Sequence, residues 1–348
     1  MNSRDLTLSA IDGIPEKIPF NPFIMHLAAV FADIDYSQKF CQNADALVNA
    51  QIKCAQAFGI DHVNVSTDAY REASAWGVEI DFSGHTPVAK KGTYLDWKDF
   101  DSIDDPNLLE TPRIQNRVEA VSFLRKEAPE QCVIGWIEAP FAELCSIFDM
   151  VEVIKIWMRK DWDKIFKKLL DRIIPIQLEF AKFQIEAGAD IIGAGDSAIS
   201  QIGPKWYKKS TLRETQKLFK SISNEVPILY HCCGDNSRID REGNDMLELI
   251  ASSGASILDI DYQVDLKLAK QKVGKNLCIR GNTDTKILGN SNIHIKRVEQ
   301  LISQTIEGGK SGGKYMFAAG CEWPWEPRDV AIRNLRTAKK VTEKLGNY

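Results

Sequence analysis

Short apolar runs alternate with longer amphipathic segments along most of this chain. Each run is rich in valine, isoleucine, leucine or aromatic residues and is bounded by glycine, proline or polar residues, a pattern typical of buried β-strands. The pattern predicts eight strands, within residues 18–23, 62–66, 132–137, 189–196, 226–230, 256–261, 276–282 and 315–319.

The segments between the later strands have helical periodicity. They predict helices over 205–222, 244–253, 266–273, 293–307 and 329–345, and a long helical stretch over 142–186. Strands that alternate with helices indicate βα units and a parallel sheet, and eight strands is the count of a TIM barrel. We therefore predict an α/β fold, a (β/α)8 TIM barrel with an N-terminal helical extension, and a single domain over 1–348. The charged, strand-poor segment 74–125 is expected to form an insertion beside the barrel.

Polar residues gather where the predicted strands end. They are Asn64, Asp68, Glu138, Asp196, His231, Cys233, Asp259, Asp261, Asn282 and Cys321. The active sites of TIM barrels lie at the carboxyl ends of the strands. We therefore expect the functional site at this end of the barrel.

Three of these residues have the chemistry of a metal site. His231 and Cys233 are two apart at a strand end, so their side chains point the same way while Cys232 points away. Cys321 ends a distant strand and can face them across the barrel mouth. One imidazole and two thiolates suit zinc, and three protein ligands leave a fourth position open for chemistry. The alternative is three ordinary buried residues, because free cysteine is often a core residue.

Composition narrows the classes of partner and the compartment. A net charge of −4 argues against nucleic acid as the main partner. No apolar run is long enough to cross a membrane, and the first residues lack the apolar core of a signal peptide. The 8 cysteines are scattered along the chain, which indicates reduced thiols and a cytoplasmic location rather than a disulfide framework.

Several motifs resemble the uroporphyrinogen decarboxylase superfamily over the whole chain. They are the segment 8–19 (Leu-Ser-Ala-Ile-Asp-Gly-Ile-Pro-Glu-Lys-Ile-Pro), Gly188-Ala189-Asp190, His231-Cys232-Cys233-Gly234, Val264-Asp265-Leu266, Gly281-Asn282 and Gly320-Cys321-Glu322. Within that superfamily the chain is most similar to the zinc methyltransferases of corrinoid systems, such as the methylcobamide:coenzyme M methyltransferases. The His-x-Cys pair with its late cysteine is the specific mark.

The resemblance implies a ligand set and a reaction. In that family the His-x-Cys pair and the late cysteine bind zinc, which implies His231, Cys233 and Cys321 as the catalytic zinc ligands here. An acidic residue near the end of the sixth strand would complete the zinc sphere; Asp261 matches this place best, and Asp259 remains open. The implied reaction moves a methyl group between a corrinoid protein and a small molecule. That molecule is a thiol acceptor such as coenzyme M, or a methylated donor such as a methyl ether or methylamine.

Two other functions remain open. One is a metal-free decarboxylase of a tetrapyrrole. The decarboxylating members carry an Arg-Gln-Ala-Gly-Arg type segment near the first strand, whereas residues 20–26 here read Phe-Asn-Pro-Phe-Ile-Met-His. A substrate with many carboxylates would lack its main counter-charges. The other is a barrel that only binds a corrinoid protein or a small ligand.

Four residues at the strand ends are predicted to bind substrate, namely Asn64, Glu138, Asp196 and Asp261. The first three also have structural alternatives: Asp196 could cap the following turn, Glu138 could hold a loop, and Asn64 could have a structural role. Trp323 and Trp325 are expected either to line an aromatic or corrinoid-facing pocket or to pack over the barrel rim. The glycine-rich segment 308–313 lacks the spacing of a phosphate-binding loop and is expected to be a turn.

Overall fold

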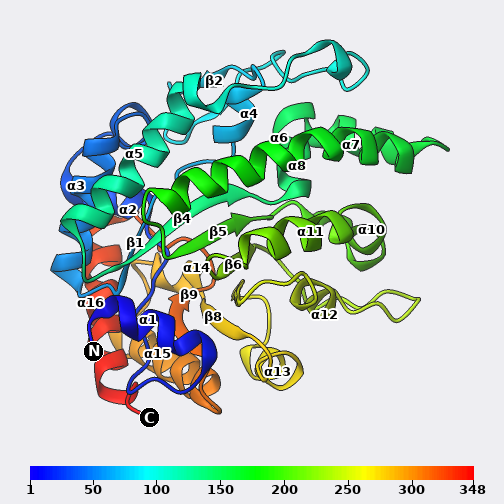
Figure 1. Cartoon of the computed structure of the whole chain (residues 1–348). Helices are drawn as coiled ribbons and strands as arrows, with labels where there is room; N and C mark the ends of the chain where they lie inside the picture. Colours follow the sequence, from blue (N-terminus) through cyan, green and yellow to red (C-terminus); the bar gives the residue numbers. More distant parts are fainter.

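The computed structural model describes residues 1–348 and contains a curled, seven-stranded sheet with helices around it (Figure 1). Its strands are, in spatial order, β1 (His62–Asn64), β4 (Cys132–Glu138), β5 (Ile191–Gly195), β6 (Ile228–Cys232), β7 (Ile257–Ile260), β8 (Cys278–Thr283) and β9 (Tyr315–Ala319). Every pair of neighbours is parallel. All seven carboxyl ends therefore lie on one side, the right in Figure 1. Every strand residue is buried, which explains the nearly continuous apolar runs.

The predicted first strand is reduced to a single bridge. Phe20 pairs in parallel with Phe317 of β9, and the Asn21 N–H donates to the Phe317 carbonyl at 2.8 Å. On the other side, the N–H of Asp61 donates to the Phe20 carbonyl at 3.0 Å, directly before β1. Prolines at 19 and 22 remove two backbone donors, which limits a longer ladder here. The segment thus lies between the two edge strands of a TIM-barrel-like sheet that has seven strands, where the sequence predicts eight.

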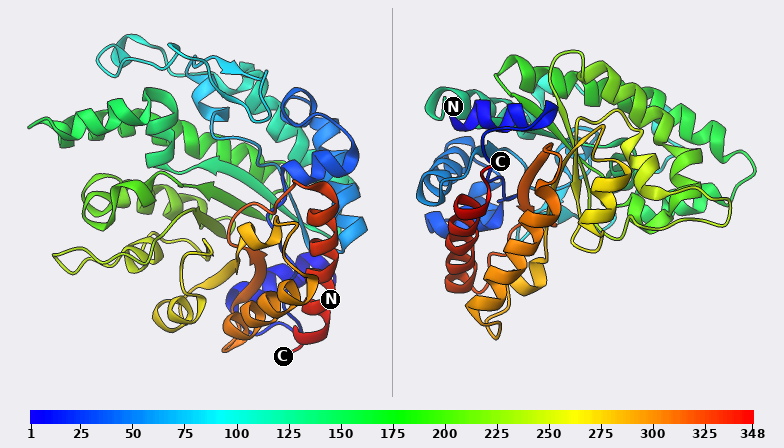
Figure 2. Two further views of the ribbon diagram at one scale, coloured as in Figure 1. Left: turned by 180° about the vertical axis from the view of Figure 1, so that it is seen from behind. Right: turned by 90° about the horizontal axis from the view of Figure 1, so that it is seen from below.

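The predicted N-terminal helical extension is present before the sheet. It comprises α1 (Ser3–Asp12), α2 (His26–Ala32), a π-helical turn η1 (Tyr36–Phe40) and α3 (Ala44–Phe58). Asn2 and Asn43 cap α1 and α3 by accepting backbone N–H groups of the first turn. The two chain ends lie close together (Figure 2), where the Ile18 N–H donates to the Gly346 carbonyl at 2.9 Å.

The predicted insertion is shorter than expected. Its first part holds α4 (Arg71–Ala75), a small hairpin of β2 (Ile80–Asp81) and β3 (Val88–Ala89), and two single turns, η2 (Phe100–Ser102) and η3 (Leu108–Glu110). Its last part is α5 (Pro112–Glu127), which packs on α3, α8 and β4 as an outer helix. The prediction of an insertion is therefore wrong for 112–125. The apolar stripe of α5 is interrupted at one inward position by the buried Arg117, which hides the helical periodicity.

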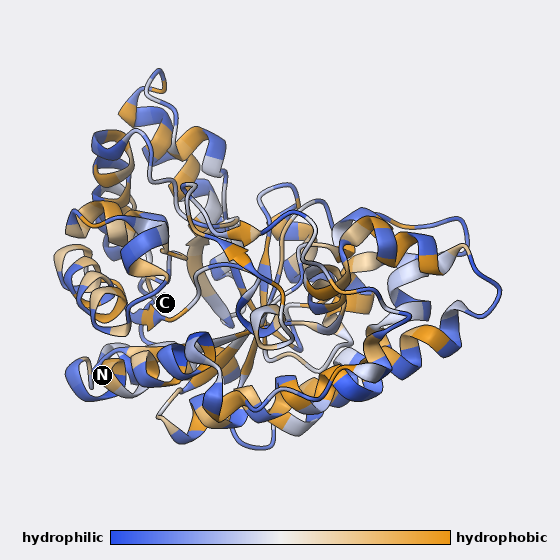
Figure 3. Cartoon of the chain, turned by 90° about the horizontal axis from the view of Figure 1, so that it is seen from above, coloured by the Kyte–Doolittle hydropathy of each residue, from blue (hydrophilic) through white to orange (hydrophobic).

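The remaining helices cover the sheet or lie beside its carboxyl ends. They are α6 (Pro140–Phe148), α7 (Met150–Trp157), α8 (Trp162–Glu186), α9 (Ile199–Ile202), α10 (Pro204–Ser210), α11 (Leu212–Ile222), α12 (Met246–Ala251), α13 (Leu266–Lys272), α14 (Thr285–Leu288), α15 (Ile295–Lys310) and α16 (Arg328–Leu345). Apolar and polar residues alternate along the outer helices (Figure 3), whose apolar sides join a core of 91 buried residues. The predicted helices 205–222 and 142–186 are divided into two and three helices. No helix combines the length and apolar character needed to cross a membrane.

Candidate metal centre

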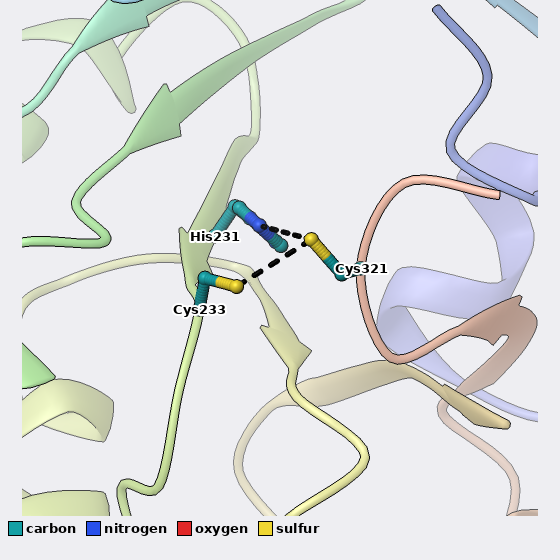
Figure 4. A group of neighbouring side chains, drawn as sticks. All are labelled: His231, Cys233 and Cys321. Carbon is teal, nitrogen blue, oxygen red and sulfur yellow. Dashed lines mark hydrogen bonds between the residues drawn. The ribbon is translucent and has the colours of Figure 1, made fainter. Parts of the chain in front are cut away.

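Three ligand atoms converge at the carboxyl ends of β6 and β9. His231 lies within β6, Cys233 follows it, and Cys321 stands two residues after β9. The Cys321 Sγ is 3.4 Å from the Cys233 Sγ and 3.9 Å from the His231 Nε2, and all three atoms lie within 4.8 Å of one another (Figure 4). Strands β7 and β8 separate β6 from β9 along the sheet, so the curl of the sheet brings these ends together. The three residues singled out from the sequence therefore do meet in space.

Asp259 and Arg280 fix the orientation of the imidazole. The His231 Nδ1 is hydrogen-bonded to the Asp259 Oδ2 at 2.8 Å, and the same oxygen accepts from the Arg280 Nη1 at 2.9 Å. All three side chains are buried. Because Nδ1 is held by a carboxylate, Nε2 is the nitrogen that faces the sulfurs, as in many histidine–metal sites. Asp259 thus lies behind the histidine, which favours Asp261 over Asp259 as an additional ligand.

Asp261 lies beside Cys233, directly after β7. Its Oδ2 is 3.3 Å from the Cys233 Sγ and accepts the Gly234 N–H at 2.9 Å, while its Oδ1 accepts the Gln263 N–H at 2.9 Å. The carboxylate therefore holds the turn after β6 against the cluster. It is not a member of the close three-atom group. Its role as a fourth ligand or substrate contact stays a prediction.

The charges of the cluster suit a dication. The hydrogen bond from Cys233 lowers the pKa of Cys321 to about 5, and it raises the pKa of Cys233 far above the usual thiol value, with burial adding to the rise. Burial disfavours a charged His231, but the Asp259 carboxylate raises the pKa of this imidazole to about 10. The metal-free cluster thus holds protons on Cys233 and His231 that a metal ion must displace. One imidazole nitrogen and two thiolates match the ligand preference of zinc.

The other predicted site residues are held by protein partners. Asp196 is fully buried; its Oδ2 accepts from the Tyr230 hydroxyl at 2.7 Å and its Oδ1 from the Ala142 N–H at 3.1 Å, in the first turn of α6. Asn64 is also buried, and its side chain donates to the Ile24 carbonyl at 3.1 Å. These contacts support the structural alternative for both residues, and substrate binding by them stays a prediction.

Glu138 and the two tryptophans have different surroundings. Glu138 ends β4, and its Oε1 accepts from the Arg71 Nη2 at 2.6 Å. Trp323 is fully buried and donates to the Ala331 carbonyl at 3.2 Å, so it packs into the rim. Trp325 stacks on His26 with ring centroids 5.3 Å apart. Glu138 therefore presents a carboxyl group at the strand ends. Its contact with substrate stays a prediction.

Sequence reasoning missed Arg280 and the aromatic wall of the cluster. Phe23 lies with its ring centroid 5.6 Å from that of His231 and 4.9 Å from that of Trp136. An arginine inside the apolar run 276–282 was a usable signal, because a buried guanidinium needs a carboxylate partner. The aromatic residues gave no such signal, since they read as ordinary core residues.

We expect Asp259→Asn to weaken metal binding in the folded protein, with some loss of stability because the buried Arg280 loses its charged partner. The amide is isosteric with the carboxylate, but it no longer supplies the negative charge that fixes and strengthens the His231 imidazole as a ligand. Such outer partners are worth about 10–100-fold in metal affinity. Competition with a chromophoric zinc chelator would measure the affinity of both proteins. Asp265→Asn, at the cap of α13, is the matched control and should retain wild-type affinity. Equal affinities for Asp259→Asn and wild type would contradict this role.

Comparisons with known proteins place the chain in a family. The profile of the family described as uroporphyrinogen decarboxylase (URO-D) matches residues 2–340. The chain belongs to the uroporphyrinogen decarboxylase family. This is an enzyme family, and the resemblance seen in the sequence is confirmed.

Relatives within the uroporphyrinogen decarboxylase family are distant. The uroporphyrinogen decarboxylase of Citrifermentans bemidjiense is 25% identical over 321 residues, covering 88% of each chain. That of Synechocystis sp. is 25% identical over 316 residues, covering 87% of this chain and 85% of its own.

The solved structures that resemble the chain include a methyltransferase and B12-independent methionine synthases. A methyltransferase from Methanosarcina mazei aligns over 99% of both chains with a TM-score of 0.82 and 19% identity. A B12-independent methionine synthase from Shewanella sp. W3-18-1 aligns over 94% of this chain and 96% of its own, with a TM-score of 0.57 and 13% identity. At these identities the likeness establishes the shared fold.

Proposed function

We propose that this family member is a zinc-dependent methyltransferase that moves a methyl group between a corrinoid protein and a small substrate in the cytoplasm. The observation that carries the proposal is the convergence of His231 Nε2 with the sulfurs of Cys233 and Cys321. The overall likeness to a methyltransferase from Methanosarcina mazei agrees with it. His231, Cys233 and Cys321 would hold the zinc, with Asp261 as the nearest additional carboxylate.

The residues of the chain orient the site and wall part of it. Asp259 fixes the His231 ring, and the Gly234–Asp261 hydrogen bond fixes the turn that carries Cys233. Phe23 and Trp136 lie beside the histidine, with ring centroids 5.6 Å and 6.4 Å from that of His231. Bound zinc would supply a Lewis acid that activates a thiol as its thiolate or polarises the heteroatom of a methylated donor. A corrinoid protein must approach from the strand ends, because only that side presents the ligand cluster.

The arginines near the strand ends argue against the alternative, decarboxylation of a tetrapyrrole with many carboxylates. Arg71 is paired with Glu138, Arg113 with Asp68, and Arg280 with Asp259. A guanidinium already paired with a carboxylate offers little to an anionic substrate. Residues 20–26 contribute an aromatic wall at the place where the resemblance puts basic residues in the decarboxylases.

Metal analysis combined with a methyl-transfer screen tests the proposal. We expect bound zinc, together with transfer either from methylcobalamin to a thiol or from a methylated donor to cob(I)alamin. Chelation of the metal should abolish the transfer, and added zinc should restore it. Uroporphyrinogen is the control substrate and should not be decarboxylated. A zinc-free protein that decarboxylates uroporphyrinogen would contradict the proposal and support the alternative.

A further inference from the structure

Five residues lie in one row across the sheet. Glu138, Gly195, His231, Asp259 and Arg280 are successive Cα partners on β4, β5, β6, β7 and β8. Side chains paired in this manner point to the same face of a sheet. Glu138 therefore points to the same side as the imidazole that faces Cys321. The residue between them in the row is a glycine, and the Glu138 carboxyl and the Trp136 indole lie over it.

The free oxygen of Glu138 lies over Gly195, on the side of the His231 strand. A Cβ atom on Gly195 would lie 3.0 Å from the Glu138 Oε2 and 3.4 Å from the Trp136 Nε1. Neither of these two polar atoms has a hydrogen-bond partner in the protein, whereas the Glu138 Oε1 is bound by Arg71. Adjacent strands are about 4.8 Å apart, so Oε2, which leans over β5, lies roughly one strand spacing from the strand of His231. The Glu138 side chain is 8% exposed, so a substrate held at the strand ends could meet this oxygen and the Trp136 N–H.

A buried group of carboxyls lies behind Glu138. Arg71 Nη2 donates to the Glu138 Oε1 at 2.6 Å, and Arg71 Nε is 3.8 Å from the Glu72 Oε2. Glu143, in the first turn of α6, is fully buried with no partner on either oxygen. Three buried carboxyls beside a single guanidinium, which contacts only two of them, cannot all stay ionised away from water. The group must therefore hold protons when the protein is at neutral pH.

The surroundings determine where the protons reside. Burial raises the pKa of Glu138 to about 8, Arg71 acts in the opposite direction, and Glu72 raises it further. Burial raises the pKa of Glu143 well above its usual value. The charge of Asp68, the other acid that acts on Glu138, is balanced by a 2.5 Å contact with Arg113. Glu138 is the member of the group whose free oxygen lies over Gly195, on the side of the His231 strand.

We propose that Glu138 is a further catalytic residue that donates a proton to the leaving oxygen of the substrate, and that the methyl donor is a methyl–oxygen compound, methanol or a methyl ether. This inference rests on the methyl transfer proposed above. The carbon–oxygen bond breaks and its electron pair stays on the oxygen, which takes the proton from Glu138. The methyl carbon bonds to the electron pair of a cobalt(I) corrinoid, which becomes methyl–cobalt(III). Glu138 is left as a carboxylate beside Arg71.

The proton balance favours this direction over methylation of a thiol. Transfer from methyl–cobalt(III) to a thiol releases the thiol proton, so it needs no acid. Transfer from a methyl–oxygen donor consumes a proton, because a free alkoxide or hydroxide is a poor leaving group. A buried group that already holds protons, with the free oxygen of one member over Gly195 and on the face of the sheet that carries His231, matches the second reaction.

The variant Glu138→Gln tests the role, because it keeps the shape and removes the acidic proton. The donors are methanol and methyl phenyl ethers whose ring substituents vary the acidity of the leaving phenol, and the acceptor is free cob(I)alamin. With the most basic leaving groups, we expect the rate of the variant to fall by about 10²–10⁴-fold, the usual contribution of a general acid. With a nitro-substituted ether the rate should fall much less, because the acidic nitrophenol leaves without a proton. Methyl transfer from methylcobalamin to 2-mercaptoethanol consumes no proton, so its rate should fall by much less than the rate with the basic leaving groups. The infrared spectrum of the metal-free protein at neutral pH should lose a protonated-carboxyl band in the variant.

The possible results separate this inference from the function on which it rests. An equal loss of rate with all ethers, an unchanged infrared spectrum, or a wild-type protein that methylates thiols but accepts no methyl–oxygen donor would each overturn the role of Glu138 and leave the methyltransferase proposal standing. A wild-type protein that holds zinc but transfers no methyl group in either direction would overturn the proposed function itself.

Discussion

Replacing Cys233 with serine should remove the metal and reduce methyl transfer to the background rate of the free reagents. Cys233 supplies one of only three converging ligand atoms, 3.4 Å from the Cys321 sulfur. A serine hydroxyl does not ionise as a thiolate does, and two remaining ligands hold zinc poorly. The loss of zinc affinity should be larger than that of Asp259→Asn, because removing an outer partner such as Asp259 lowers metal affinity by about 10–100-fold. Elemental analysis should find about one zinc per wild-type chain, as a three-ligand site implies, and little in the variant.

The neighbouring cysteine provides the matched control. Cys232 is buried in the core, and its side chain points to the opposite side of β6. Cys232→Ala should keep zinc and methyl transfer and cost about 1 kcal/mol of stability, as is common for a small core truncation. Circular dichroism of Cys233→Ser should match that of the wild type, since the site lies at the strand ends and outside the core. Equal zinc loss in both variants would show that the ligand assignment is wrong.

The sequence predicted most of the fold because its parallel strands are buried on both sides. Such strands are short apolar runs, and seven of the eight predicted ones are strands of the sheet. The exception, 18–23, is as apolar as the others, but its prolines and its place between two edge strands leave only a bridge at Phe20. The helix α5 was hidden for another reason. Its inward-facing Arg117 looks like a surface residue until the whole fold is known.

The candidate metal ligands could be predicted, because their residue types and spacing are those of a metal site. The pair of His231 and Cys233 has strand spacing, and Cys321 ends a second strand, so their meeting follows from the fold. The contacts that hold the ligands and their neighbours in place could not be predicted in the same way. Asp259 was seen only as a possible ligand, because nothing local shows that it is held between His231 and Arg280. The position of Glu138 over Gly195 likewise depends on the register of three strands.

Replacing Arg280 with methionine should destabilise the protein by about 3–5 kcal/mol, the usual cost of removing one partner of a buried ion pair. Arg280 and Asp259 are 1% and 2% exposed, so water cannot replace the lost guanidinium. The Asn21 carbonyl would also lose its 2.9 Å hydrogen bond from the Arg280 Nε. Urea unfolding measures the effect. Arg241→Met, on an exposed turn, is the control and should change stability by no more than about 0.5 kcal/mol.

The double variant Arg280→Met with Asp259→Asn identifies the cause of this loss. If the cost comes from the Asp259 charge left without its partner, neutralising that residue should recover part of the stability, so the double variant should be more stable than Arg280→Met alone. The two residues are in direct contact, so their effects should couple by about 0.5–3 kcal/mol. Additive losses would instead indicate that methionine simply packs badly beside Phe23, which lies 5.5 Å from the guanidinium carbon. The ion pair would then contribute little to the fold, and its role would be to orient His231.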